Sequence, residues 1–159
     1  VKKVDETLQA IKPWVRPIST SEYIDALASG KICVVLAFSG DAIQARSTAK
    51  QHSDIDYQIA KEGGLLWFDT VAIVANAKNV DGAHKFLDYL LDPKQVAAIT
   101  NFVSYANANV NSAPFVKPEL LKDSGIYPTP EIMRRLQVLP HTTQEMTTQY
   151  KQIWIRFSQ

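Results

Sequence analysis

Apolar and polar residues follow two different periods along the chain, which predicts helices that alternate with short strands. In the segment 79–92, Ala83, Phe86, Leu87 and Leu90 recur at the spacing of one helix face. This spacing, with the breakers between segments, predicts helices over residues 4–12, 19–30, 41–51, 79–92, 93–103, 118–122 and 130–136, and from residue 142 onward. Continuous apolar or alternating runs predict strands over residues 31–38, 55–60 and 70–75.

Residues at the expected boundaries support these helices. The Ser and Thr cluster at 19–21 can cap the second helix, and Gly30 can end it. Pro93 suits the first turn of the helix that it opens. Thr142, followed three residues later by Glu145, predicts a capping box at the start of the last helix. The inner face of that helix is predicted to carry Met146, Tyr150, Ile153, Trp154 and Phe157.

Strands that alternate with helices predict an α/β fold. The run "KICVVLAF" at 31–38 is expected to be a strand buried on both faces. Cys33 lies in this run as the sole cysteine, and we expect a small buried hydrophobe rather than a reactive thiol. Few strands are visible, and the chain opens inside the helical pattern "VKKVDETLQAIKPW". We therefore expect a piece of a longer protein.

Composition and charge exclude several classes of function. The 159 residues are 46% hydrophobic and 21% charged, as in soluble globular proteins. The net charge of +1 arises from 17 basic and 16 acidic residues, so no overall field would attract nucleic acid. No apolar run approaches the roughly 20 residues that a membrane-spanning helix needs.

Metal and cofactor chemistry have no support in the sequence. His52, His84 and His141 stand alone, without a second ligand at zinc-site spacing. No phosphate-binding glycine loop is present. The "FSGD" turn lacks the second glycine of a nucleophile elbow, so a triad through Ser39 would require long-range assembly. We expect no cofactor and no metal.

Two motifs combine aromatic and acidic residues. Phe38 and Asp41 lie in "LAFSGD" at 36–41, and Trp67 and Asp69 lie in "LLWFDT" at 65–70. In open α/β sheets, ligands bind at strand ends, so these four side chains could line one cleft. Ring faces attract ammonium groups, and carboxylates accept charge-assisted hydrogen bonds from them. The pair of motifs favours an organic cation as ligand.

Other interpretations of the same residues remain open. Asp41 could cap the helix that begins near it, because Asp is a favoured capping residue. Trp67 and Phe68 could belong to the hydrophobic core. The two acids could also serve as the acid and base of a glycosidase, since such enzymes use a carboxylate pair.

Five stretches together make the sequence recognisable. It resembles the periplasmic polyamine-binding proteins of bacterial ABC transporters, the putrescine and spermidine binders. The matching stretches are "STSEYIDALASGKICV" at 19–34, "FSGDAIQA" at 38–45, "KEGGLLWFDTVAIVANAKNVDGAHKFLDYLLDP" at 61–93, "SYANAN" at 104–109 and "IYP" at 126–128.

The resemblance implies a type II periplasmic-binding fold with two lobes and the ligand clamped between them. This chain would be the C-terminal half. Residues 1–58 would belong to the second lobe, 59–107 to the first lobe after a hinge crossing, and 108–159 to the second lobe again.

The resemblance also implies roles for individual residues. Trp67 would pack along the methylene chain of the polyamine, Asp69 would hold an ammonium group, and Tyr105 would line the same pocket. Asp41 matches an acid of putrescine-type members. Phe38 departs from the family, which usually has tryptophan there.

The function expected from the resemblance is that of a periplasmic, non-enzymatic binding protein. It would capture a polyamine, putrescine in preference to spermidine, and deliver it to the membrane permease of an ABC transporter. A polyamine sensor or surface interaction protein on the same fold is an alternative, and a glycoside hydrolase fragment is another. Exposed lobe interfaces would also allow the chain to associate with itself.

Overall fold

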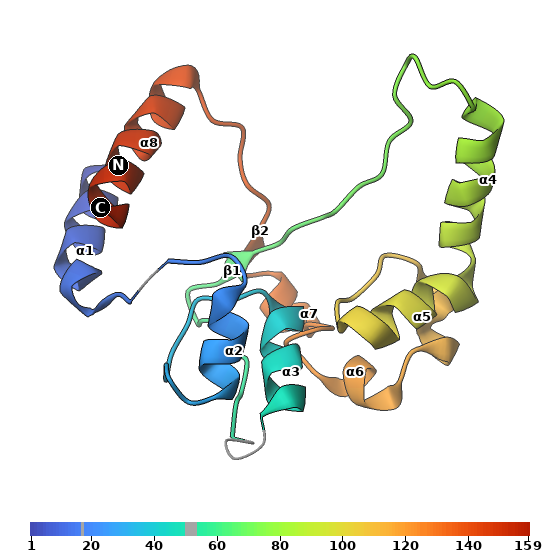
Figure 1. Ribbon diagram of the computed structural model, residues 1–159, viewed down its shortest axis with the longest axis horizontal. Coiled ribbons are helices and arrows are strands. Elements are labelled where there is room, and N and C mark those ends of the chain that lie inside the picture. Colours follow the sequence, from blue (N-terminus) through green and yellow to red (C-terminus); the bar gives the residue numbers. More distant parts are fainter. Residues whose placement is uncertain (17, 50–53) are drawn as a thin grey trace. The chain divides into compact units, whose positions relative to one another are not determined.

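The computed structural model describes residues 1–16, 18–49 and 54–159. Its α-helices and strands are labelled in Figure 1. The elements, in chain order, are α1 (Lys2–Ile11), η1 (Lys12–Trp14), α2 (Glu22–Ala28), α3 (Ser39–Thr48), β1 (Gly64–Leu65), α4 (Val80–Leu91), α5 (Pro93–Val103), η2 (Val110–Phe115), α6 (Pro118–Lys122), α7 (Pro130–Met133), β2 (Leu136–Gln137) and α8 (Gln144–Ser158).

The chain divides into two compact units. The first comprises residues 1–22 and 139–159, and the second comprises residues 23–138. The lobe segments expected from the sequence, with boundaries after residues 58 and 107, remain a prediction.

In the first unit, α1 and α8 lie side by side (Figure 1). Arg156 of α8 forms an ion pair with Asp5 of α1, with 2.6 Å between Nη2 and Oδ2. An ion pair therefore joins two helices that are distant in the sequence.

Ile153 and Phe157 are the buried residues of α8, as predicted for its inner face. Tyr150 and Trp154, which were predicted on the same face, are 40% and 51% exposed, so that part of the prediction is wrong.

The start of α8 lies one residue later than predicted. Thr143, rather than Thr142, is the capping residue, and its Oγ1 accepts a hydrogen bond from the backbone nitrogen of Met146 at 3.2 Å. Glu145 accepts instead from the side chain of Gln149 within the helix. The predicted capping box is therefore wrong, although a threonine cap is present.

The segment 31–38 does not form the predicted buried strand. Val34 is 89% exposed, Leu36 is 99% exposed and Cys33 is also exposed, so the expectation of a buried cysteine is wrong. The segments 55–60 and 70–75 are likewise outside any strand. A strand is completed by a neighbour that satisfies its backbone hydrogen bonds. None of these segments belongs to a sheet of the described residues.

Two residues each from β1 and β2 form the sheet of the described residues. They pair in parallel, Gly64 with Leu136 and Leu65 with Gln137. Gly63, just before β1, has a φ of 108°, and a Cβ there would overlap the carbonyl oxygen of Arg135. Only glycine allows both this backbone conformation and so close an approach.

The core of the second unit lies against α5. Its buried members are Ala97, Val116, Leu120 and Ile126, and the half-buried side chain of Ile43 from α3 packs against them. The predicted helix over 93–103 is confirmed. Its cap is Asp92, whose Oδ1 accepts hydrogen bonds from the backbone nitrogens of Lys94 and Gln95 at 2.9 and 3.1 Å.

The loop after α5 is held by a polar network. Ser104 ends the helix in the left-handed conformation, with φ 60°. The side chain of Asn107 donates to Thr100 Oγ1 and accepts from Ser112 Oγ, both at 2.9 Å. Thr100 and Ser112 are 1% and 2% exposed. This network fixes the loop that carries Tyr105.

Arg46 connects α3 to two later segments. Its Nε donates to the carbonyl oxygen of Ile55 at 2.7 Å, and its Nη1 lies 3.5 Å from the carboxylate of Asp123. The helix runs from Ser39 to Thr48, so the predicted start near Asp41 is two residues late. Lys50 and Gln51, the end of the predicted helix, lie outside the described residues, as does His52.

None of the helices in the described part of the chain has the length and apolar character of a membrane span.

Candidate functional site

The carboxylate of Asp41 binds two tyrosine hydroxyls. Asp41 lies in the first turn of α3. Tyr105, in the loop after α5, donates its hydroxyl hydrogen to Oδ1 at 2.8 Å. Tyr23 of α2, which lies beside α3 (Figure 1), donates to Oδ2. The alternative in which Asp41 caps α3 is wrong, because Phe38 occupies the capping position and the carboxylate faces the two tyrosines.

Asp41 differs from the other partly buried acids in its partners. Three acidic residues of the described chain are partly buried, namely Asp5, Asp41 and Asp123. Asp5 is paired with Arg156 and Asp123 with Arg46. Asp41 has no ion pair with any Lys, Arg or His in residues 1–16, 18–49 and 54–159. Its negative charge is hydrogen-bonded but not balanced by a cation from these residues.

Both tyrosines remain protonated donors at neutral pH. Burial, followed by the hydrogen bond to Asp41, raises the pKa of Tyr23 to about 12. The same two causes raise the pKa of Tyr105 above its ordinary value. A phenol beside a carboxylate resists ionisation because the phenolate would repel the existing charge. The hydroxyls can therefore orient Asp41 without neutralising it.

Gly40 allows Tyr105 to reach this position. A Cβ on residue 40 would overlap the ring of Tyr105. Gly40 itself is buried in the first turn of α3. The Tyr105 ring thus packs on Gly40, while the hydroxyl of the same tyrosine binds the next residue, Asp41.

Trp67 and Asp69 form a second pair. The indole Nε1 of Trp67 donates to Oδ1 of Asp69 at 3.1 Å. Asp69 is exposed, and the side chains of Trp67 and Phe68 are 61% and 60% exposed. The alternative in which these two aromatic residues belong to the core is therefore wrong. An exposed carboxylate at this position needs no permanent cation.

Phe38 lies immediately before α3 and is 59% exposed. The structure thus brings together Asp41 with Tyr105, and separately Trp67 with Asp69. No hydrogen bond or ion pair of the described residues joins the two pairs. Their assignment to one ligand site remains a prediction.

Comparison with known proteins decides the family. Residues 1–129 match the family model described as bacterial extracellular solute-binding protein. The chain belongs to this family. This solute-binding protein is 38% identical over 143 residues to the putrescine-binding periplasmic protein SpuD of Pseudomonas aeruginosa, covering 88% of the chain and 39% of the relative. It is 40% identical over 137 residues to the putrescine-binding periplasmic protein PotF of Escherichia coli, covering 84% and 37%.

A solved structure supports the same family. The structure from Listeria monocytogenes named "Putative spermidine/putrescine ABC transporter" matches with a TM-score of 0.82 at 30% sequence identity. The match covers 96% of this chain and 46% of that chain. The predicted periplasmic-binding-protein-like fold is therefore confirmed, with fewer strands than expected. The chain spans less than half the length of the relatives that it matches.

The family also bears on catalysis and location. Its members and the relatives above are solute-binding proteins rather than enzymes, which leaves the glycoside hydrolase alternative without support. The extracellular family and the periplasmic relatives indicate an extracytoplasmic location for this solute-binding protein. Across the residues that the structure describes, no group of three His, Cys, Asp or Glu side chains could hold a metal ion.

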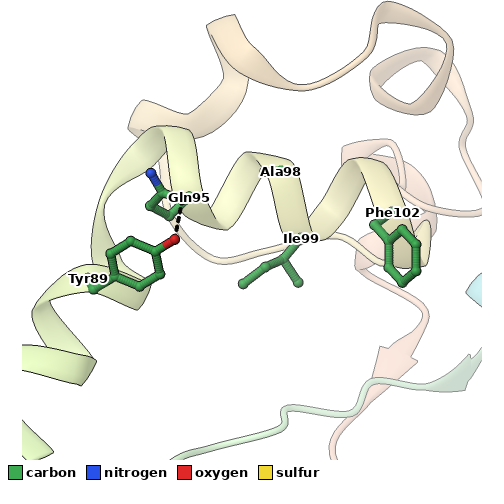
Figure 2. A pocket seen from close by; sticks show the side chains of 5 residues that line it. All are labelled: Tyr89, Gln95, Ala98, Ile99 and Phe102. Carbon is green, nitrogen blue, oxygen red and sulfur yellow. Dashed lines mark hydrogen bonds between the residues drawn. The ribbon is translucent and has the colours of Figure 1, made fainter.

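A separate hollow of about 320 Å³ lies on α4 and α5 of the solute-binding protein. Figure 2 shows the side chains of Tyr89, Gln95, Ile99 and Phe102 around it, with the Tyr89 hydroxyl bonded to Gln95. The donor–acceptor distance of that bond is 2.7 Å. None of the lining residues is charged, so this hollow offers no carboxylate to a cation.

Tyr23 is the residue that sequence reasoning missed. Its place beside Ile24 and Leu27 in the pattern of α2 marks it as part of an apolar helix face. The side chain is half-buried, as that pattern predicts, but its hydroxyl reaches Asp41, 18 residues later. No local signal in the sequence links the two residues.

Proposed function

We propose that this chain forms part of a periplasmic binding protein that captures a polyamine, putrescine in preference to spermidine, and delivers it to the permease of an ABC transporter. The observation that carries the proposal is the carboxylate of Asp41, which is partly buried yet has no cationic partner among the described residues. A buried charge without a counter-charge is costly. A ligand cation would supply the missing partner.

The remaining hydrogen-bonding capacity of Asp41 suits an ammonium group. An ionised carboxylate has about four lone-pair sites, and an ammonium group has three N–H donors. The two tyrosine hydroxyls occupy one site on each oxygen. The sites that remain could accept N–H groups from a primary amine. Charge-assisted hydrogen bonds of this kind contribute about 1.5–3 kcal/mol each.

Asp69, Trp67 and Phe38 would contact the second ammonium group and the methylene chain of the polyamine. Asp69 offers a second carboxylate, which Trp67 already orients through its indole N–H. The exposed rings of Trp67 and Phe38 offer flat apolar faces for methylene groups. They also attract ammonium groups, with about 0.5–2 kcal/mol for each favourable contact. In this proposal the two acids bind opposite ends of the ligand.

Two lobes would close around the ligand. The proposed lobe segments are residues 1–58, 59–107 and 108–159, with hinge crossings between them. In this arrangement Asp41 lies on one lobe and Asp69 on the other, together with Tyr105, so the hydrogen bond from Tyr105 to Asp41 would join the two lobes. A diamine that contacts both acids would stabilise the closed form over the open form, because those contacts exist together only in the closed form.

The preference for putrescine rests on relatives and on Asp41. Two relatives are named as putrescine-binding proteins, and others as spermidine/putrescine-binding proteins. Asp41 supports this preference because it matches an acid of the putrescine-type members that the sequence resembles. Cadaverine and agmatine also occur in the names of relatives.

Calorimetry on the full-length protein tests the proposal. We expect saturable binding of putrescine and weaker binding of spermidine. The control ligand is 1,4-butanediol, which has the same four-carbon chain without charges and should not bind. No saturation with either polyamine at high micromolar concentration would refute the proposal. Uptake of labelled putrescine by a deletion strain, with and without the restored gene, tests delivery to a permease.

A further inference from the structure

Two tyrosines hold Asp41 from different parts of the second unit. Tyr23 belongs to α2 and donates to Oδ2, whereas Tyr105 follows α5 and donates to Oδ1. The terminal torsion of an Asp side chain has a broad, roughly two-fold energy profile. One donor leaves the carboxylate free to tilt about its bonded oxygen. Two donors on different oxygens fix the plane of the group.

The chemistry of the donors matters as much as their number. At the other two partly buried acids, an arginine occupies the position that the tyrosines occupy at Asp41. An arginine balances the charge of the acid that it binds, whereas a protonated phenol does not. Tyrosines therefore orient Asp41 while its negative charge stays available to a ligand.

We propose that Tyr23 is a positioning residue of the cation site, which acts through Asp41 by holding the carboxylate plane in the orientation that a primary ammonium group binds. This inference rests on the proposed function. It extends that function to a residue that does not itself contact the ligand. The half-buried ring of Tyr23 and the bond of its hydroxyl to Oδ2 carry the inference.

The decisive variant is Tyr23→Phe in the full-length protein, with putrescine binding measured by calorimetry. The ring is kept, and only the hydroxyl is removed. Because a net hydrogen bond contributes about 0.5–1.5 kcal/mol, we expect the dissociation constant to rise about two- to thirteenfold. Tyr89→Phe is the matched control. It removes a hydroxyl bonded to Gln95 in the uncharged hollow and should leave the dissociation constant unchanged.

A double-mutant cycle separates positioning from a general structural role. Asp41→Ala removes the group through which Tyr23 acts, so adding Tyr23→Phe to that variant should change the affinity less than twofold. Thermal unfolding of all variants reports folding separately. Equal affinity of Tyr23→Phe and the unaltered protein would overturn the inference alone. The inference would also be overturned if Tyr23→Phe lowered the affinity equally in the unaltered protein and in the Asp41→Ala variant. Absence of putrescine binding by the unaltered protein would overturn the proposed function and this inference with it.

Discussion

The ring of Tyr105 packs on Gly40, at a place where a Cβ on residue 40 would overlap three carbon atoms of the ring. The two residues are far apart in the sequence, and the hydroxyl of the same tyrosine binds Asp41, the residue after Gly40. The absence of a side chain at position 40 therefore allows the hydrogen bond at position 41.

Gly40→Ala should weaken both the fold and the site. The added methyl must displace the Tyr105 ring, and overpacking of this kind costs about 1–3 kcal/mol in the free energy of unfolding. Displacement of the ring also removes a donor from Asp41, so the affinity for putrescine should fall. Chemical denaturation and calorimetry measure the two effects.

Gly64→Ala is the control for this substitution. A Cβ at position 64 would meet its nearest neighbours, on Leu136 and Ile59, at 3.5 and 3.6 Å, which is ordinary contact. We expect a clearly smaller loss of stability and no change in affinity. Equal effects of the two alanine substitutions would contradict the role of the Gly40–Tyr105 contact.

Asp69→Asn should lower the affinity for putrescine without unfolding the protein. The asparagine oxygen can still accept from the indole of Trp67, but the charge that would hold an ammonium group is lost. We expect a loss of about 1.5–3 kcal/mol in binding free energy, the range for a hydrogen bond to a charged group. Isothermal calorimetry measures it, with the exposed acid of α4 altered in Asp88→Asn as the control. An unchanged dissociation constant would remove Asp69 from the site.

Alkaline pH should destabilise the protein through Tyr23. Its pKa is about 12 in the folded state, against an unperturbed tyrosine value of about 10. Between these values the unfolded chain loses the proton that the folded chain keeps, so the stabilising contribution is complete below about pH 10 and is lost as the pH rises toward about 12. Urea unfolding of the unaltered protein and of Tyr23→Phe over this range isolates the effect. A stability difference between the two that stays constant from pH 9 to 12 would contradict it.

Asn107→Ala should destabilise the loop that carries Tyr105. The substitution leaves the buried hydroxyl of Thr100 without its donor, at a cost of about 1–3 kcal/mol for the unsatisfied group. Ser112 loses its bond to Asn107 but keeps the one to the carbonyl oxygen of Asn109 at 2.7 Å. Asn111→Ala is the matched control, since Asn111 is exposed and only its backbone nitrogen takes part in the asparagine network. Urea denaturation should show a clear loss for the first variant and little for the second. Similar losses of stability in the two variants would contradict the stabilising role of the Asn107 side chain.

Helices were largely predictable because their hydrogen bonds and caps are local. The helix from Pro93 to Val103 was predicted with its observed bounds, since the proline and the apolar spacing both lie within it. The cap of the last helix is Thr143 rather than the predicted Thr142, because two adjacent threonines compete for the same role. Such a choice depends on the direction in which the chain enters the helix, which composition does not encode.

Strands were not predictable in the same way, because a strand needs a partner from elsewhere. The run 31–38 has strand composition, yet Val34 and Leu36 are exposed and the segment belongs to no sheet of the described residues. The sheet that does form uses Gly64 and Leu65 with residues more than seventy positions later. Periodicity over a few residues cannot identify such a pairing.

The candidate site was predictable where motifs and the family resemblance named its residues. Asp41 and Tyr105 were expected near one another, and the hydrogen bond between them agrees with that expectation. Tyr23 was not predicted as a site residue, because its ring fits the apolar face of α2 and the sequence does not show where its hydroxyl bonds. The function of all these residues as ligand contacts stays a prediction.

Ser104 has a consequence for selection and for protein engineering. It is the only non-glycine with positive φ in residues 1–16, 18–49 and 54–159, and it turns the backbone from α5 toward Tyr105. A glycine there would relieve about 1–2 kcal/mol of steric cost but would widen the range of directions in which the chain can leave the helix. Screening for heat resistance alone would therefore favour the glycine, whereas screening for ligand capture should retain the serine.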